Sequence, residues 1–133
     1  MAKERTSLYY LKFADNFKSY TTGDIIFKQG DPGLMMYVVK EGTVELRAEG
    51  VLLEIVEPGH IFGEMALIEG STRSATAVAA SDCKVVPLDQ DKFMFMVQQT
   101  PYFAIEVLKI MARRLRTANH ELTRNSGIHR IEK

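Results

Sequence analysis

The sequence has little of several residue types that mark particular classes of protein. Its single cysteine, Cys83, excludes an internal disulfide framework and is predicted to be an ordinary strand residue. Only three histidines are present, scattered along the chain, so no Cys/His metal site is expected. The apolar runs are too short to cross a bilayer, and the segment after Met1 is charged where a signal peptide would be apolar. These absences predict a soluble, cytoplasmic protein with no metal and no membrane partner.

The chain also lacks net charge, since 17 lysines and arginines balance 17 aspartates and glutamates. This balance excludes a strongly basic nucleic-acid-binding protein as a description of the whole chain. The charge is unevenly distributed. Residues 21–91 hold five basic and twelve acidic side chains, whereas residues 109–133 hold seven basic and two acidic ones. The chain therefore has an acidic middle and a basic C-terminal end.

A length of 133 residues suits one domain with a buried core, so we expect a single domain over residues 1–133. Most of the glycines lie between residues 21 and 88, separating short runs that are rich in β-forming residues. The predicted strands are 25–27, 36–40, 43–48, 51–56, 75–80 and 84–88. Many short strands separated by turns indicate an antiparallel barrel or jelly roll over residues 21–88. Before it, mixed three- and four-residue spacings of apolar residues predict a short helix over residues 6–18.

Two helices are predicted after the strands, over about residues 89–125. Asp89 and its neighbours are expected to cap a short helix over residues 92–98. Pro101 suits the first turn of a second, longer helix over residues 102–125.

The longer helix carries two apolar stripes. The shorter stripe, Phe103, Val107 and Ile110, is predicted to contact the strands. The other follows spacings of 4, 3, 4, 3 and 4 residues and consists of Ala104, Leu108, Met111, Leu115, Ala118 and Leu122. Such a heptad seam is typical of a helix that pairs with another helix, which predicts a homodimer through residues 104–122. Its interface residues would be Leu108, Met111, Leu115, Ala118 and Leu122. An alternative interpretation joins both stripes into one wide face directed at the core.

The segment of residues 58–76 carries the chemistry. Gly63 precedes a short helical stretch over residues 64–68, and a glycine there lets an anion approach free backbone N–H groups. Arg73 can offer a fork of donors to a phosphate, and Ser74 adds a hydroxyl. Glu64 can accept hydrogen bonds from sugar hydroxyls. Together these groups suit a ribose phosphate, although an arginine at a strand start can also be merely solvated.

The full motif of this segment is more specific than its parts. It reads Phe62-Gly63-Glu64-Met65-Ala66-Leu67, followed by Arg73-Ser74-Ala75. This pattern resembles the phosphate-binding cassette of the cyclic nucleotide-binding domain family, found in bacterial catabolite activators, regulatory subunits of cAMP-dependent protein kinase and cyclic-nucleotide-gated channels. Residues 23–24, 29–33, 37–42 and 111–115 also match, and the resemblance covers roughly residues 8–125.

The resemblance implies a mainly β fold with flanking α-helices. It would be an eight-stranded antiparallel β-roll, or jelly roll, with an N-terminal helix, a short helix in the cassette and a long C-terminal dimerisation helix. Glu64 would bind the ribose 2′-hydroxyl, Arg73 the phosphate oxygens and Ser74 the phosphate. The remaining implied ligand contacts are the backbone amides of Gly63, Met65 and Ala66, the apolar pocket residues Leu46, Leu53 and Val56, and Arg114, which would tie the long helix to the site.

The sequence departs from the family at several positions. The hydroxyl residues that read the adenine in bacterial activators fall here on Ala118 and Asn119, so the resemblance leaves base recognition open. His60 stands where an acidic residue is frequent and is interpreted as an exposed turn residue. We expect no helix-turn-helix domain within these residues, and therefore no nucleic-acid partner through this chain alone.

The expected function is that of a non-enzymatic cyclic nucleotide receptor without a cofactor. Ser74, where a threonine tends to mark cGMP-preferring members, favours cAMP as the ligand, with cGMP as the alternative. Binding would shift the position of the long helix and so act on an unknown downstream effector. Two alternatives stay open: the sensor domain of a transcription regulator without its DNA-binding domain, and a β-roll scaffold that has lost nucleotide binding. An enzyme is disfavoured because no nucleophile–base pair converges on the cassette.

Overall fold

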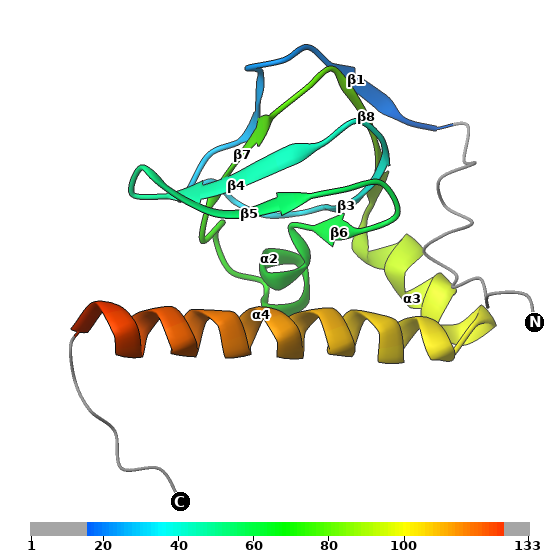
Figure 1. The fold of residues 1–133 in the computed structure, drawn as a ribbon. Helices are drawn as coiled ribbons and strands as arrows, with labels where there is room; N and C mark the ends of the chain where they lie inside the picture. Colours follow the sequence, from blue (N-terminus) through cyan, green and yellow to red (C-terminus); the bar gives the residue numbers. More distant parts are fainter. Residues whose placement is uncertain (1–15, 127–133) are drawn as a thin grey trace, which may run out of the picture.

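The computed structural model of the protein describes the backbone of residues 16–126 and the side chains of residues 16–120 (Figure 1). The strands are β1 (Lys18–Tyr20), β2 (Ile25–Phe27), β3 (Met36–Glu41), β4 (Val44–Ala48), β5 (Val51–Val56), β6 (Ile61–Phe62), β7 (Thr76–Ala79) and β8 (Cys83–Leu88). The helices are α2 (Glu64–Glu69), α3 (Gln90–Gln99) and α4 (Tyr102–Ser126). In the described chain, none of these helices combines the length and the apolar character that crossing a membrane requires.

The strands form two four-stranded sheets, in the orders β1-β8-β3-β6 and β2-β7-β4-β5. Every pairing within them is antiparallel. The sheets face each other as a roll, and α4 runs along one side of it with α2 between (Figure 1). This confirms the mainly β fold with flanking helices. The six predicted runs all form strands, and β1 and β6 complete the eight.

The structure corrects the N-terminal boundary of the roll. The predicted helix over residues 6–18 lies mostly outside the described residues, but its C-terminal end is wrong because Lys18 begins β1. Backbone pairing with β8, in which Lys18 lies opposite Val85, determines this conformation. The Phe17 ring also lies 5.1 Å from the Lys84 ammonium. Contacts with a distant strand therefore override the local helical spacing.

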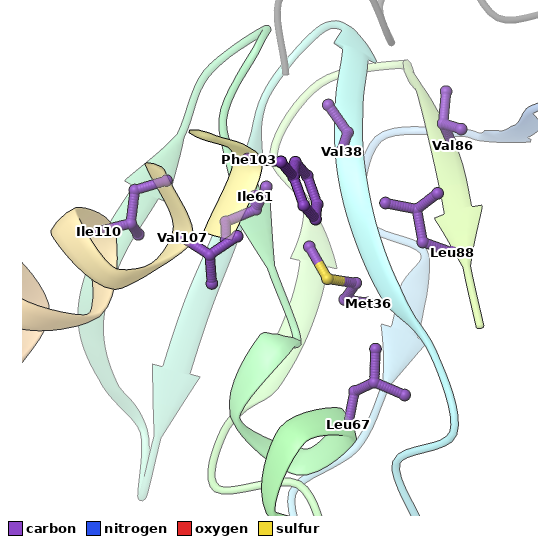
Figure 2. Close-up of a cluster of buried hydrophobic side chains, with 9 residues drawn as sticks. All are labelled: Met36, Val38, Ile61, Leu67, Val86, Leu88, Phe103, Val107 and Ile110. Atoms are coloured by element: carbon purple, nitrogen blue, oxygen red, sulfur yellow. The ribbon is translucent and has the colours of Figure 1, made fainter. Parts of the chain in front are cut away.

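Two hydrophobic clusters lie on opposite faces of the sheet that contains β3 and β8. Successive side chains of a strand point to opposite faces, so Met36 and Val38 of β3 join one cluster while Tyr37 and Val39 join the other. The cluster on the helical side consists of Met36, Val38, Ile61, Leu67, Val86, Leu88, Phe103, Val107 and Ile110 (Figure 2). Because both faces of β3 are covered, its residues form an almost uninterrupted apolar run.

The two stripes of α4 have different environments. Phe103, Val107 and Ile110 are buried against the strands, as predicted. Leu108 and Leu115 of the heptad seam remain 58% and 63% exposed. The exposure of Leu108 and Leu115 contradicts the alternative of one wide core-facing stripe, although Met111 of the seam packs against the core cluster. Leu122 lies outside the residues whose side chains are described.

The link between the two sheets depends on Gly42, which joins β3 to β4 with φ +79°. A side chain there would overlap the carbonyl oxygen of Asp82 and would lie 2.7 Å from Cβ of Cys83. Gly50, in the β4–β5 hairpin, has the same φ of +79°, but a Cβ at that position meets open space. An alanine at Gly50 would therefore suffer backbone strain alone, whereas an alanine at Gly42 would suffer backbone strain and steric overlap.

We expect Gly50→Ala to lower the free energy of unfolding by about 1–2 kcal/mol, the cost of a left-handed backbone for alanine. Gly42→Ala should lower it by about 1–3 kcal/mol more, because the methyl group must displace packed atoms. Urea denaturation of the two variants beside the parent measures both values. Equal losses in the two variants would contradict the packing at Gly42.

Candidate functional site

Arg73 lies buried between α2 and β7, with 5% of its surface exposed. Its Nη1 donates to the carbonyl oxygen of Gly63 at 2.9 Å, and its Nη2 donates to that of Met35 at 2.7 Å. The guanidinium carbon lies 3.9 Å from the centroid of the Phe27 ring, a cation–π distance. Arg73 is therefore not the solvated strand-start residue that the sequence left as an alternative.

The Arg73 charge has no counter-ion among the described residues. No ion pair there joins it to a carboxylate, and its Nε is buried without a hydrogen-bond partner. Burial lowers the pKa of the Arg73 guanidinium, and Tyr37, Asp31 and Glu64 oppose that shift. An arginine nevertheless stays protonated in proteins. The structure thus holds an enclosed positive charge beside the start of α2 with donor capacity that remains unused.

The loop between β2 and β3 fixes the backbone of Arg73. The amide of Gly30 donates to the Arg73 carbonyl at 2.8 Å, and the amide of Arg73 donates to the Asp31 carbonyl at 2.7 Å. Gly33, in the same loop, passes so close that a Cβ there would overlap Cβ of Ala66 and lie 3.1 Å from the Arg73 guanidinium. The glycine loop at residues 29–33 is therefore one wall of the cassette, which we define as residues 62–74.

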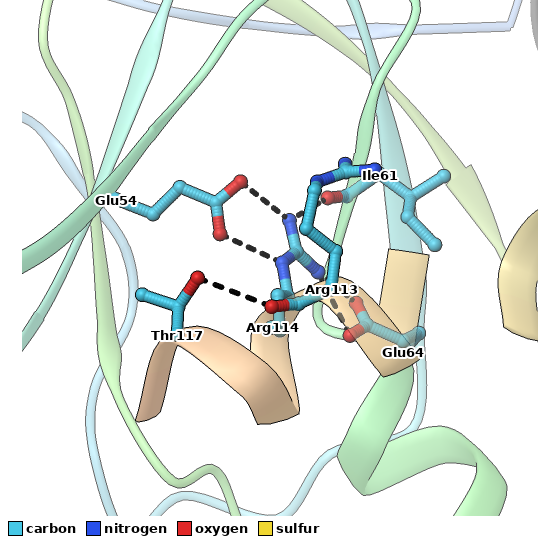
Figure 3. Close-up of polar contacts among 6 residues, drawn as sticks. All are labelled: Glu54, Ile61, Glu64, Arg113, Arg114 and Thr117. Carbon is cyan, nitrogen blue, oxygen red and sulfur yellow. Dashed lines mark hydrogen bonds and ion pairs between the residues drawn. The ribbon is translucent and has the colours of Figure 1, made fainter. Parts of the chain in front are cut away.

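Glu64, the first residue of α2, is a second buried charge, with 1% of its surface exposed. Both its carboxylate oxygens accept hydrogen bonds of 2.8 Å from Nη1 of Arg114, on α4 (Figure 3). Arg114 also donates from Nε and Nη2 to Glu54 on β5, at 2.7 and 3.2 Å, and from Nη2 to the Ile61 carbonyl at 2.6 Å. One side chain of α4 thereby joins β5, β6 and α2.

The carboxylates around Arg114 control its ionisation. Burial lowers the pKa of the Arg114 guanidinium, but the hydrogen bonds and charges of Glu54 and Glu64 outweigh burial, and the pKa is raised overall. Arg114 is therefore a permanent cation with internal counter-ions. Arg73 is buried as well, and it has none.

The other cassette residues differ in exposure. Ala66 is 2% exposed and packs beneath the glycine loop, whereas Met65 is 39% exposed. Gly63 caps the N-terminus of α2, and Ser74, next to Arg73, is exposed. These residues surround the start of α2, where the first backbone N–H groups of a helix have no partner inside it.

The predicted pocket residues of β4 and β5 lie in different environments. Val56 is fully buried in the cluster between the sheets, and Leu46 packs against it. The register shifts where Leu46 pairs with Glu54 and Arg47 with Leu52, so Leu53 is an additional residue in β5 and is 53% exposed. The structure therefore does not bring Leu53 together with Leu46 and Val56.

The remaining predicted residues lie outside the cassette. Ala118 and Asn119 are exposed on α4, and Ala118 lies one helical turn after Arg114, on the same face. His60 is exposed in a turn, where its amide donates to the Glu57 carbonyl. Cys83 lies in β8, as predicted, and its side chain is buried. The described residues contain no cluster of His, Cys, Asp or Glu that would hold a metal ion.

Sequence reasoning missed two residues of the site, Glu54 and Phe27. Glu54 binds Arg114 through two hydrogen bonds, and the Phe27 ring lies under the Arg73 guanidinium. Glu54 is the one charged residue of β5, whose sequence is VLLEIV, and that isolated charge was a usable signal. Phe27 had no comparable signal, because an aromatic residue in a short strand is ordinary core material.

Comparison with known proteins identifies the family. The model of the cyclic nucleotide-binding domain matches residues 17–100, which include both sheets and the cassette. A relative named cyclic AMP receptor protein, from Thermus thermophilus, is 36% identical over 108 residues, which is 77% of this chain and 50% of the relative. A cAMP-dependent protein kinase regulatory subunit from Debaryomyces hansenii is 44% identical over 78 residues, which is 57% of this chain and 17% of that protein.

The fold agrees with these sequence matches. The crystal structure of the Thermus thermophilus catabolite activator protein superposes with a TM-score of 0.75 and 32% identity, covering 90% of this chain and 63% of that chain. This chain spans about half the length of the bacterial relatives that it matches. The family match and the shared fold agree with the cassette, in which Glu64 and Arg73 are each buried. The chain therefore belongs to the cyclic nucleotide-binding domain family and is related to bacterial cAMP receptor proteins and to regulatory subunits of cAMP-dependent protein kinase.

Proposed function

We propose that this domain is a non-enzymatic receptor whose ligand is a cyclic nucleotide, with cAMP preferred. The observation that carries the proposal is the buried Arg73 charge, which has no carboxylate partner among the described residues and keeps an unpartnered Nε. Buried charges are normally paired, because an isolated ion loses its hydration at high cost. An anionic ligand supplies the missing partner.

A cyclic nucleotide matches the groups around Arg73. Its phosphate carries one negative charge, which Arg73 neutralises, while Ser74 and the amides of Gly63, Met65 and Ala66 supply further donors. Its single free ribose hydroxyl suits Glu64, whose oxygens keep acceptor capacity beyond the two bonds from Arg114. The apolar side chains of Leu46 and Val56, which pack together between the sheets, then line the space around the nucleotide.

The preference for cAMP rests on two observations. Both the bacterial and the kinase relatives carry cAMP in their names. Ser74 follows the arginine where a threonine would favour cGMP. Ala118 has no side-chain hydrogen bond to offer a base, so the discrimination between cAMP and cGMP rests on Asn119 or on backbone groups and is modest.

The signal leaves the site through α4. Arg114 binds Glu64 directly, so a ligand that engages Glu64 changes the balance of contacts that hold α4 against the cassette. The ligand thereby shifts the population between two positions of α4, and an unidentified effector protein responds to that shift. The exposed seam of α4 additionally pairs two copies of the domain into a homodimer.

Arg73→Ala should weaken cAMP binding by at least about tenfold and up to about 150-fold, because a charge-assisted hydrogen bond contributes about 1.5–3 kcal/mol. Arg73→Lys should restore part of the affinity, since an ammonium lacks the planar fork. Calorimetric titration with cAMP and cGMP measures each variant. Arg47→Ala is the matched control, because Arg47 lies on β4 and pairs with Glu45. Unchanged affinity in a folded Arg73→Ala protein would refute the cassette assignment.

Leu115→Glu should convert the dimer into a folded monomer, because it places a charge in an apolar interface that excludes water. Sedimentation equilibrium at micromolar concentration distinguishes the two states. Arg113→Gln changes the net charge by the same amount on the opposite side of α4 and should stay dimeric. A parent protein that remains monomeric with and without cAMP would disprove the pairing of the seam.

A further inference from the structure

The guanidinium of Arg114 uses all its hydrogen-bonding capacity. A guanidinium has five N–H groups, and five hydrogen bonds leave Arg114. Its Nε and Nη2 face the two oxygens of Glu54, a bidentate arrangement that fixes the plane of the group. Its Nη1 alone reaches Glu64 (Figure 3).

One positive charge is therefore shared by two carboxylates in unequal ways. Glu54 takes the two-nitrogen edge of the guanidinium, although its side chain is 31% exposed. Glu64 takes a single nitrogen, although its side chain is only 2% exposed. By burial alone, Glu64 has the greater need of a cation, because a buried carboxylate loses more hydration. Arg114 nevertheless gives its two-nitrogen edge to Glu54, because Glu54 on β5 accepts from both Nε and Nη2.

This division leaves Glu64 able to accept further hydrogen bonds. Two carboxylate oxygens offer about four lone-pair sites, and Nη1 occupies two of them. Without the Glu54 charge, the two-nitrogen edge of Arg114 would turn to Glu64, and the guanidinium charge would be paired with that carboxylate alone. A carboxylate whose charge is neutralised in this way is a weaker acceptor for a ligand hydroxyl than one that shares its cation with Glu54.

We propose that Glu54 is a positioning residue that holds Arg114 away from a bidentate pairing with Glu64 and so keeps Glu64 available to a ligand hydroxyl. Glu54 thereby sets the preference of the site for a ribose over a deoxyribose cyclic nucleotide. The inference rests on the proposed receptor function and concerns one contact of that same site.

The test compares cAMP with 2′-deoxy-cAMP, which lacks only the hydroxyl in question, by calorimetric titration. The parent protein should prefer cAMP by about tenfold or more, the value of a hydrogen bond to a charged group. Glu54→Gln should reduce that preference by at least about threefold through weaker cAMP binding, while the affinity for 2′-deoxy-cAMP stays within about twofold. Glu57→Gln, which removes the same charge from an exposed position three residues later, should behave as the parent does.

Each other outcome has a definite meaning. An unchanged preference in Glu54→Gln, or equal losses for both ligands, would overturn the positioning role. A parent that binds both ligands equally would overturn it as well and would leave the receptor function standing. A parent that binds neither ligand would refute the proposed cAMP receptor function and this inference with it. If Glu54→Gln does not fold, Glu54→Asp, which keeps the charge but shortens its reach, should show the same loss of preference.

Discussion

The carboxylate of Glu64 is almost fully buried at the start of α2, and it is satisfied by a guanidinium that comes from a helix fifty residues later in the chain. A buried carboxylate without a partner would be strongly destabilising, so α4 must lie where Arg114 can reach it. The apolar stripe that begins at Phe103 packs on the strands in the same orientation. One constraint thus fixes the helix, leaves Leu108 and Leu115 of its seam exposed and connects it to the cassette.

Arg114 and Arg73 differ in how their charges are compensated within the described residues. Arg114 has internal counter-ions in Glu54 and Glu64, and its pKa is raised overall, so it is a structural cation. Arg73 has carbonyl oxygens and an aromatic ring as neighbours, and burial lowers its pKa. A guanidinium in such surroundings is held in place without being neutralised. Under the proposed function, this difference distinguishes the charge that binds the ligand, Arg73, from the structural charge, Arg114.

Local patterns predicted much of this structure. The strands β2 to β5, β7 and β8 follow from alternation and glycine turns, and the cassette follows from the motif at residues 62–75, whereas β6 was not predicted. β1 could not be predicted, because its conformation comes from pairing with β8. The contact of Glu54 with Arg114 could not be predicted either, because the two residues are 60 positions apart and come together only when α4 packs across the roll. Long-range contacts, which sequence spacing does not contain, account for the missing parts.

We propose that the contact between Arg114 and Glu64 transmits the state of the cassette to α4. Amide hydrogen exchange of α4, measured with and without saturating cAMP, tests this claim most directly, because exchange reports local opening at each turn. We expect cAMP to change the exchange of the amides around Arg114 in the parent. This change should be lost in a folded Arg114→Lys protein that still binds the ligand. If cAMP slows exchange in the cassette and leaves every amide of α4 unchanged in the parent, the claim is contradicted.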